Sequence, residues 1–144
     1  MMVPVCLWAA GCSKIAWEFD YTEAETKARL AQKDLLLYFR RWSSPQCGQI
    51  EGNWLHKSAA VANALKNKVN CWLEWDFVQE IARKYRLKDC PAFVLIRPDG
   101  HGDKVTGVIT EEQFLGFIER AESPPPSGPT NGQPPPQRTP AARR

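Results

Sequence analysis

Two cysteine patterns that would assign this sequence to a class at once are absent. The chain has five cysteines, an odd number, and no two of them have the CxxC spacing that is typical of a zinc ribbon or a dithiol redox site. We therefore do not expect a small fold held together by a framework of disulfides.

An excess of charge of one sign is absent as well. The sequence has 19 basic and 16 acidic residues, and three of its arginines lie after Ser123, in a stretch without any acid. The rest of the chain is therefore balanced in charge. This balance argues against a surface that binds nucleic acid.

Signals for a cofactor or a metal ion are missing too. The sequence contains no Gly-rich phosphate loop and no Ser/His/Asp arrangement. Its two histidines, His56 and His101, do not combine with the cysteines in a metal-ligand spacing. We expect neither a cofactor nor a metal.

No segment is apolar enough to span a bilayer, but residues 1–12 have a pattern of their own. They are uncharged and end in small residues before Cys12, which resembles the end of a bacterial lipoprotein signal with Cys12 as the lipidated residue. The apolar run is short and no basic residue precedes it, so an apolar N-terminus without a signal is an equal alternative. The first interpretation predicts an envelope protein, membrane-anchored or periplasmic, and the second a cytoplasmic one.

The composition changes abruptly at Ser123. Residues 123–144 contain eight of the twelve prolines and no large apolar side chain, which predicts a disordered Pro-rich tail. The remaining length and the 43% hydrophobic content suit one globular domain. We expect that domain to be a monomer.

Between Trp17 and Ala121 the hydrophobic periodicity alternates between helix and strand. Thr22 and Glu25 have the spacing of a capping box, and Pro45 suits the first turn of a helix. We expect helices at residues 22–32, 45–54, 59–67, 77–85 and 110–121, and strands at 35–39, 69–75, 92–96 and 104–109. This order predicts an α/β sandwich whose mixed sheet is parallel through the crossovers and antiparallel at the final hairpin.

Four stretches in this order resemble the thioredoxin family, and most closely its small bacterial envelope members. They are "WEFDYTEAETKARLAQKDLLLYF" (17–39), "SSPQC" (43–47), "DCPAFVLIRPDG" (89–100) and Gly107 with the closing helix. The resemblance implies a thioredoxin-like three-layer α/β/α sandwich over residues 17–122, ending in a β-hairpin and a helix. It also places Pro91 on the cis-proline of the family.

The resemblance places the degenerate motif Ser44-Pro45-Gln46-Cys47, an SxxC, where the family has CxxC. Ser44 stands in place of the nucleophilic cysteine and Ser43 in place of a tryptophan. Tyr38 occupies the strand position of a buried aspartate. The scaffold is kept, while three positions of the active constellation differ.

Disulfide exchange needs a thiolate that attacks and a second thiol that resolves the mixed disulfide. The Ser44 hydroxyl does not ionise near neutral pH. We expect Cys47, one turn further along the helix, to face the core. The resemblance brings Cys90 beside Cys47, so either the two form a relocated redox pair or they are neighbouring thiols that never oxidise together. Cys71 is most simply a core residue.

Two functions stay open. The first is an atypical thiol–disulfide exchange protein that acts on protein or peptide partners through Cys47 and Cys90. The second is a redox-inactive module that binds extended peptide between Ser44 and Pro91, with Pro45 and an exposed Trp42 as contacts. The incomplete dithiol motif leaves enzymatic activity undecided.

Overall fold

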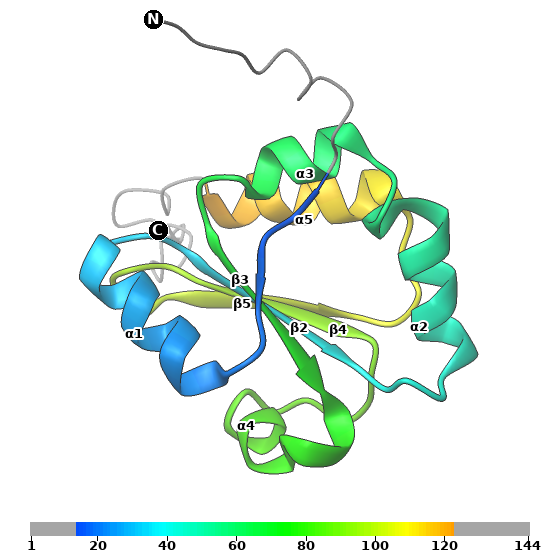
Figure 1. Cartoon of the computed structure of the whole chain (residues 1–144), viewed down its shortest axis with the longest axis horizontal. Helices are drawn as coiled ribbons and strands as arrows, with labels where there is room; N and C mark the ends of the chain where they lie inside the picture. The colour runs from blue at the N-terminus through cyan, green and yellow to red at the C-terminus, as the bar shows by residue number, and fades with distance from the viewer. Residues whose placement is uncertain (1–13, 123–144) are drawn as a thin grey trace, which may run out of the picture.

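A five-stranded mixed sheet lies at the centre of residues 14–122, the part of the chain that this computed structural model describes. The predicted lipoprotein signal with Cys12 and the predicted Pro-rich tail lie outside the described residues. The strands are β1 (Trp17–Glu18), β2 (Leu35–Arg40), β3 (Val69–Glu74), β4 (Ala92–Ile96) and β5 (Gly102–Thr106), and their order across the sheet is β1-β3-β2-β4-β5 (Figure 1).

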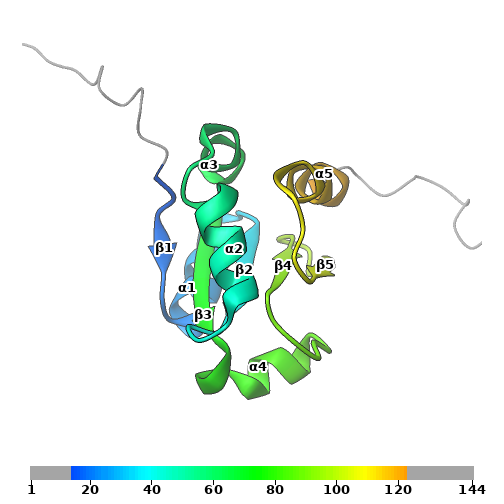
Figure 2. The ribbon, with the colours of Figure 1, turned by 90° about the vertical axis from the view of Figure 1, so that its right-hand side faces the viewer.

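Helices cover both faces of this sheet. They are α1 (Tyr21–Ala31), α2 (Pro45–Ile50), which continues as a π-helical turn (Glu51–Leu55), α3 (Ala59–Leu65), α4 (Gln79–Lys84) and α5 (Glu111–Glu122). Helices α3 and α5 lie side by side on one face, with α2 beside them (Figure 2). Helices α1 and α4 pack against the other face, so the expected three-layer α/β/α sandwich is confirmed.

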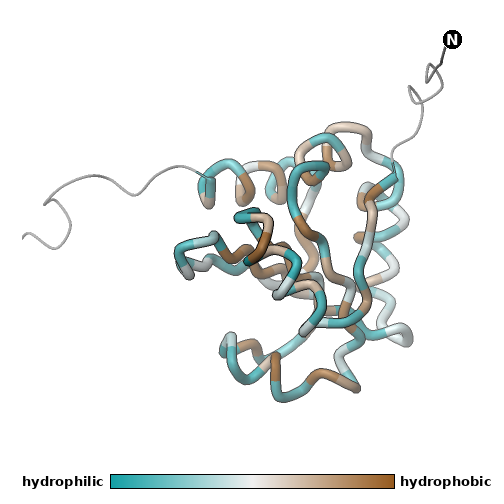
Figure 3. Tube along the Cα trace, turned by 60° about the vertical axis from the view of Figure 1, so that its left-hand side comes forward, coloured by the Kyte–Doolittle hydropathy of each residue, from teal (hydrophilic) through white to brown (hydrophobic). Residues whose placement is uncertain are grey.

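Strand β2 is the central strand of the sheet, and all five residues from Leu35 to Phe39 are buried. Their side chains alternate between the two faces, as the pleat of a strand requires. Leu36 and Tyr38 join one core, whereas the other three residues join the second. The expectation of a strand covered on both faces is confirmed, and Figure 3 shows the hydrophobic residues gathered along the central strands.

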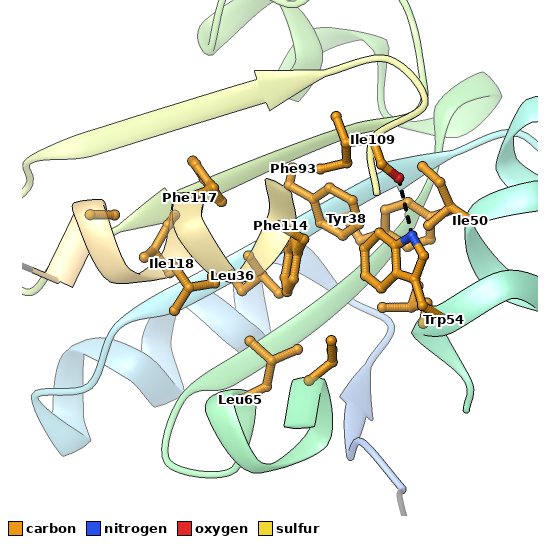
Figure 4. Close-up of a cluster of buried hydrophobic side chains, with 14 residues drawn as sticks. Leu36, Tyr38, Ile50, Trp54, Leu65, Phe93, Ile109, Phe114, Phe117 and Ile118 are labelled. Carbon is orange, nitrogen blue, oxygen red and sulfur yellow. Dashed lines mark hydrogen bonds between the residues drawn. The ribbon is translucent and has the colours of Figure 1, made fainter. Parts of the chain in front are cut away.

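The core under α3 and α5 is rich in aromatic rings. Phe93 stacks on Tyr38 at 4.7 Å between ring centroids and lies 4.7 Å from Phe114. The indole N–H of Trp54 donates a hydrogen bond of 3.1 Å to the carbonyl of Ile109, which satisfies its polar atom in the core (Figure 4). These contacts fix the π-helical turn that follows α2 against the start of α5.

The direction of β4 corrects the expected topology. Strands β1, β3 and β2 are parallel, but β4 is antiparallel to β2 as well as to β5. Phe39 of β2 pairs both with Leu73 near the end of β3 and with Ala92 at the start of β4. The chain therefore enters β4 at the same end of the sheet at which it leaves β3. The segment between them, which contains α4, is not a crossover between parallel strands.

Three local predictions were also wrong. Helix α1 is capped by Asp20, whose side chain accepts from the N–H of Glu23 at 2.9 Å, and not by Thr22. The apolar periodicity of the predicted helices 22–32 and 77–85 places Leu30 and Phe77 on their buried faces, but these side chains are 78% and 85% exposed and belong to no core. Phe77 lies in a 3-10 turn (Trp75–Phe77) before α4, which begins two residues later than the apolar spacing suggested.

The last hairpin and β1 also differ from expectation. Strand β5 ends at Thr106 because Gly107 takes a positive φ of 92°, a conformation that favours glycine. Strand β1 has only two residues, too few to give a periodic signal. Within residues 14–122, no helix has the length and apolar character that a bilayer crossing requires.

Candidate functional site

The turn between β2 and α2 holds the degenerate motif at one end of the sheet. Ser44 is the N-cap of α2, and its Oγ accepts a hydrogen bond from the N–H of Cys47 at 3.3 Å. The same hydroxyl donates to Gln46 Oε1 at 3.1 Å. Pro45 is exposed at the first helical position. Ser44 therefore has a structural role as a helix cap.

Cys47 lies one turn inside the helix and is fully buried. Its Sγ accepts a hydrogen bond from the backbone N–H of Arg41 at 3.5 Å. The prediction that this thiol faces the core is confirmed. Cys71, in the middle of β3, is also fully buried, and burial raises its pKa to about 12.

Cys90 comes to the same place from the loop before β4. It lies beside Ser44 and Pro45. Burial, followed by the charge of the Cys47 sulfur, raises the pKa of Cys90 to about 11. Cys90 is only partly buried, and its peptide bond to Pro91 is cis. Cys47, Cys71 and Cys90 are all free, so residues 14–122 contain no disulfide.

An open hollow of about 320 Å³ lies over the motif. Cys90 lines it, whereas Cys47 does not. Pro91 is buried, and its carbonyl accepts from the N–H of Gly107 at 2.9 Å. The residues that line the hollow are Arg41, Ser43, Ser44, Pro45, Gln46, Asp89 and Cys90.

Two aromatic side chains are exposed at this end of the sheet. Trp42 is 75% exposed, as expected from its place on the loop, and Phe77 is 85% exposed. The preceding residues of both, Arg41 and Asp76, form a salt bridge of 3.2 Å. This bridge brings the two loops together, so both rings lie at the same end of the sheet. The exposure of Phe77 has no signal in the sequence, because its spacing from Ile81 is also the spacing of a helix face.

A charged network lies behind the motif. The guanidinium of Arg40 binds both carboxylate oxygens of Glu51, at 2.8 and 3.0 Å, and both of Glu74, at 3.0 and 3.1 Å. It also lies over the ring of Trp72, 4.9 Å from the centroid. Because Glu51 starts the π-helical turn and Glu74 ends β3, this network ties the helix that carries Cys47 to the sheet.

Tyr38 completes the network where the resemblance placed an aspartate. Its hydroxyl donates to Glu51 Oε2 at 2.8 Å. Burial, followed by the charge of Glu51, raises the pKa of Tyr38 far above its usual range. The phenol therefore keeps its proton and remains a donor to Glu51.

The remaining polar candidates lie elsewhere. His56 stacks on Trp72 at 5.7 Å between ring centroids, and His101 is exposed on the β4–β5 hairpin. Among residues 14–122, no group of three or more His, Cys, Asp or Glu side chains could hold a metal ion. The structure thus brings together Ser44, Pro45, Cys47 and Cys90, with Trp42 on the adjoining loop, while Cys12 lies outside the described residues.

The sequence matches no protein-family model and no curated protein. Solved structures do match it. A thioredoxin from Thermus thermophilus is similar with a TM-score of 0.64 and 24% identity, covering 74% of this chain and 86% of the thioredoxin. An oxidoreductase, DsbH, is similar with a TM-score of 0.62 and 14% identity, covering 83% of this chain and 91% of DsbH.

A third similar structure is the C-terminal domain of Neisseria meningitidis DsbD in its oxidised form. Its TM-score is 0.62 at 17% identity, covering 73% of this chain and 98% of that domain. The described part of this chain has a thioredoxin-like fold.

Proposed function

We propose that this protein exchanges disulfides with protein or peptide partners through Cys47 and Cys90. The observation that carries the proposal is the position of Cys90, which lines the hollow over the motif, beside the start of the helix that carries Cys47. Exchange needs one sulfur that bonds to the partner and a second that releases it. Two neighbouring thiols meet this need without a cysteine at position 44.

The reaction converts a dithiol and a partner disulfide into an internal disulfide and a partner dithiol. Two electrons and two protons pass from Cys47 and Cys90 to the two partner sulfurs. The reverse reaction oxidises a partner dithiol and returns both cysteines to thiols. Ser44 takes no part in electron transfer, since it holds the N–H of Cys47 and has no sulfur.

The similar structures favour an oxidoreductase over other functions that this fold serves. One of them is named as an oxidoreductase and another is a DsbD domain in its oxidised form. We further propose that the domain, residues 17–122, works as a monomer in the bacterial cell envelope, held there by a lipid on Cys12. Detection of a lipid on the Cys12 peptide of the protein isolated from its host would support this location, and an unmodified peptide in a cytoplasmic fraction would contradict it.

The test of the exchange function is a redox titration of the full-length chain. The protein is equilibrated in glutathione buffers of graded redox potential, alkylated and mapped by mass spectrometry. We expect a Cys47–Cys90 disulfide to form reversibly within the potentials of natural thiol pools. The proposal fails if both cysteines stay reduced at every potential at which the chain remains folded.

The second candidate function is peptide binding without redox chemistry. The observation that favours it is the pair of exposed rings, Trp42 and Phe77, on two loops that the Arg41–Asp76 salt bridge joins. Exposed aromatic residues are frequent anchors in protein interfaces. A reduced and carboxymethylated polypeptide, which carries no thiol, tests this function by titration. Tight binding that is lost in Trp42→Ala and kept in Cys90→Ser would favour the binding module.

A further inference from the structure

The two thiols of the site differ in their access to solvent. Cys47 is 0% exposed, whereas Cys90 is partly exposed and lines the open hollow. Cys71 is 0% exposed as well. Among residues 14–122, Cys90 is thus the one thiol that an incoming sulfur can reach without a rearrangement of the core.

The structural settings of the two sulfurs differ in the same way. Cys47 lies one turn inside α2, and its Sγ accepts from the backbone N–H of Arg41 at 3.5 Å. Cys90 lies on the loop before β4 and lines the hollow together with Ser44 and Pro45. The buried sulfur is therefore held inside the motif turn, whereas the other sulfur faces the space that a partner would enter.

Together these differences assign different roles to the two cysteines, an assignment that rests on the proposed exchange function. We infer that Cys90 is the sulfur that carries the partner in the mixed disulfide, and that Cys47 is the buried sulfur that makes and breaks the internal bond. A protein with a CxxC motif would offer the first sulfur from the start of the helix. Here it comes from the loop before β4.

The oxidising direction shows how the roles divide. A partner thiolate attacks Cys90 Sγ and forms the mixed disulfide. The Cys47–Cys90 bond breaks, and Cys47 leaves with the electron pair and gains the proton that the partner thiol lost. A second partner thiolate then attacks the partner sulfur of the mixed disulfide, and Cys90 leaves and is protonated. The partner gains a disulfide and the protein ends as a dithiol, which glutathione disulfide or another small disulfide reoxidises.

A pair of single variants in the full-length chain tests this assignment, with glutathione disulfide as the probe. In Cys47→Ser, the Cys90 thiolate attacks glutathione disulfide, forms a mixed disulfide and releases one glutathione. In Cys90→Ser, only the buried Cys47 could react. We expect the Cys90 adduct in the first variant to form at least about tenfold faster than a Cys47 adduct in the second, because access limits exchange.

Controls separate chemistry from folding. The variant Cys71→Ser lacks a buried thiol that lies outside the site. We expect it to form the Cys47–Cys90 disulfide as the unaltered chain does. Cys47→Ala replaces Cys47→Ser if the buried hydroxyl unfolds the chain. Circular dichroism before the reaction and peptide mapping after it show whether each variant is folded and which sulfur has reacted.

The outcomes also separate this inference from the proposed function. A rapid, persistent adduct on Cys90 and none on Cys47 supports the assignment. A Cys47 adduct that forms as fast as the Cys90 adduct, or a folded Cys47→Ser chain that forms none, overturns it. If the unaltered chain still forms the Cys47–Cys90 disulfide in that case, only the assignment of roles is wrong. If it forms no such disulfide, the exchange function fails.

Discussion

At the end of the sheet where β2 and β3 finish, the charged residues Arg40, Glu51 and Glu74 are nearly enclosed and hold α2 to the sheet. Beside them a thiol and two aromatic rings remain open to solvent. At the opposite end, Lys68 pairs with Asp34 and Glu122, and Arg97 donates to the last carbonyls of α5. There the polar side chains pair with one another and with the last turn of α5.

This difference suggests that the two ends of the sheet have different roles. The far end stabilises the fold by fixing the end of α5 against the starts of β2 and β3. The site end uses a buried network to fix the helix that carries Cys47, while Cys90 on the loop before β4 stays accessible. Four predictions test this comparison, starting with the largest expected effect.

The first prediction concerns the network behind the motif. Replacing Glu51 with alanine leaves Arg40 with one acidic partner and removes the acceptor of the Tyr38 hydroxyl. We expect the free energy of unfolding to fall by about 3 kcal/mol, as is typical when one partner of a buried ion pair is lost. Urea denaturation measures the change.

The matched control lies at the far end. Glu122→Ala removes an acidic partner of Lys68, but the Glu122 side chain is 44% exposed and Asp34 remains as a partner. We expect a loss below about 1 kcal/mol, the usual range for an exposed ion pair. An equal loss in the two variants would show that the ends of the sheet do not differ in this way.

The network also shows what a sequence can and cannot predict. The alternation of apolar residues and the capping signals predict most elements, because these signals are local. Ser58 caps α3, and Thr110 with Gln113 forms the capping box of α5, as the spacing of these residues suggests. The pairing of Arg40 with Glu51 and Glu74 joins three separate segments, so no periodicity in the sequence indicates it.

The sequence predicts those parts of the candidate site that follow from the order of the motifs along the chain. The resemblance placed Cys47 and Cys90 together, and the cis peptide bond at Pro91 agrees with it. The exposure of Phe77 was not predictable, because a helix that began at Phe77 would have the same apolar spacing. The salt bridge between Arg41 and Asp76, which joins the loops of Trp42 and Phe77, depends on the register of these two loops.

The second prediction restores a sulfur at the head of α2. In Ser44→Cys, the new thiol occupies a helix start, where free N–H groups lower the pKa of a thiol. At pH 7 it should react with iodoacetamide about a hundredfold faster than Cys90, because the gain in thiolate exceeds the loss in nucleophilicity. Ser43→Cys places a thiol one residue earlier, outside the cap, and is the matched control. Equal rates at the two positions would show that the helix start does not activate a thiol here.

The third prediction is a pH dependence. Burial, followed by the charge of Cys47, raises the pKa of Cys90 to about 11, so at neutral pH this thiol is almost wholly protonated. Its alkylation rate should rise about tenfold for each pH unit between 7 and 10, because only the thiolate reacts. Peptide mapping after brief alkylation measures the rate. A plateau below pH 9 would mean that the environment of Cys90 does not disfavour its thiolate.

The fourth and smallest effect compares one backbone position near each end. Gln32 follows α1 with a φ of 56° and Arg86 follows α4 with a φ of 59°, both in the left-handed region that favours glycine. Arg86→Gly should raise the free energy of unfolding by about 0.5–1 kcal/mol, because relief of the backbone strain exceeds the extra entropy of the unfolded chain. Gln32→Gly should raise the free energy of unfolding less, because the Gln32 side chain donates to the carbonyl of Arg29 at 3.1 Å and that bond is lost.

Thermal unfolding of both variants shows which of them is stabilised more. If Arg86→Gly is destabilising instead, the guanidinium of Arg86 has a role on the loop that leads to Cys90, and the site end is more tightly held than its open thiol suggests.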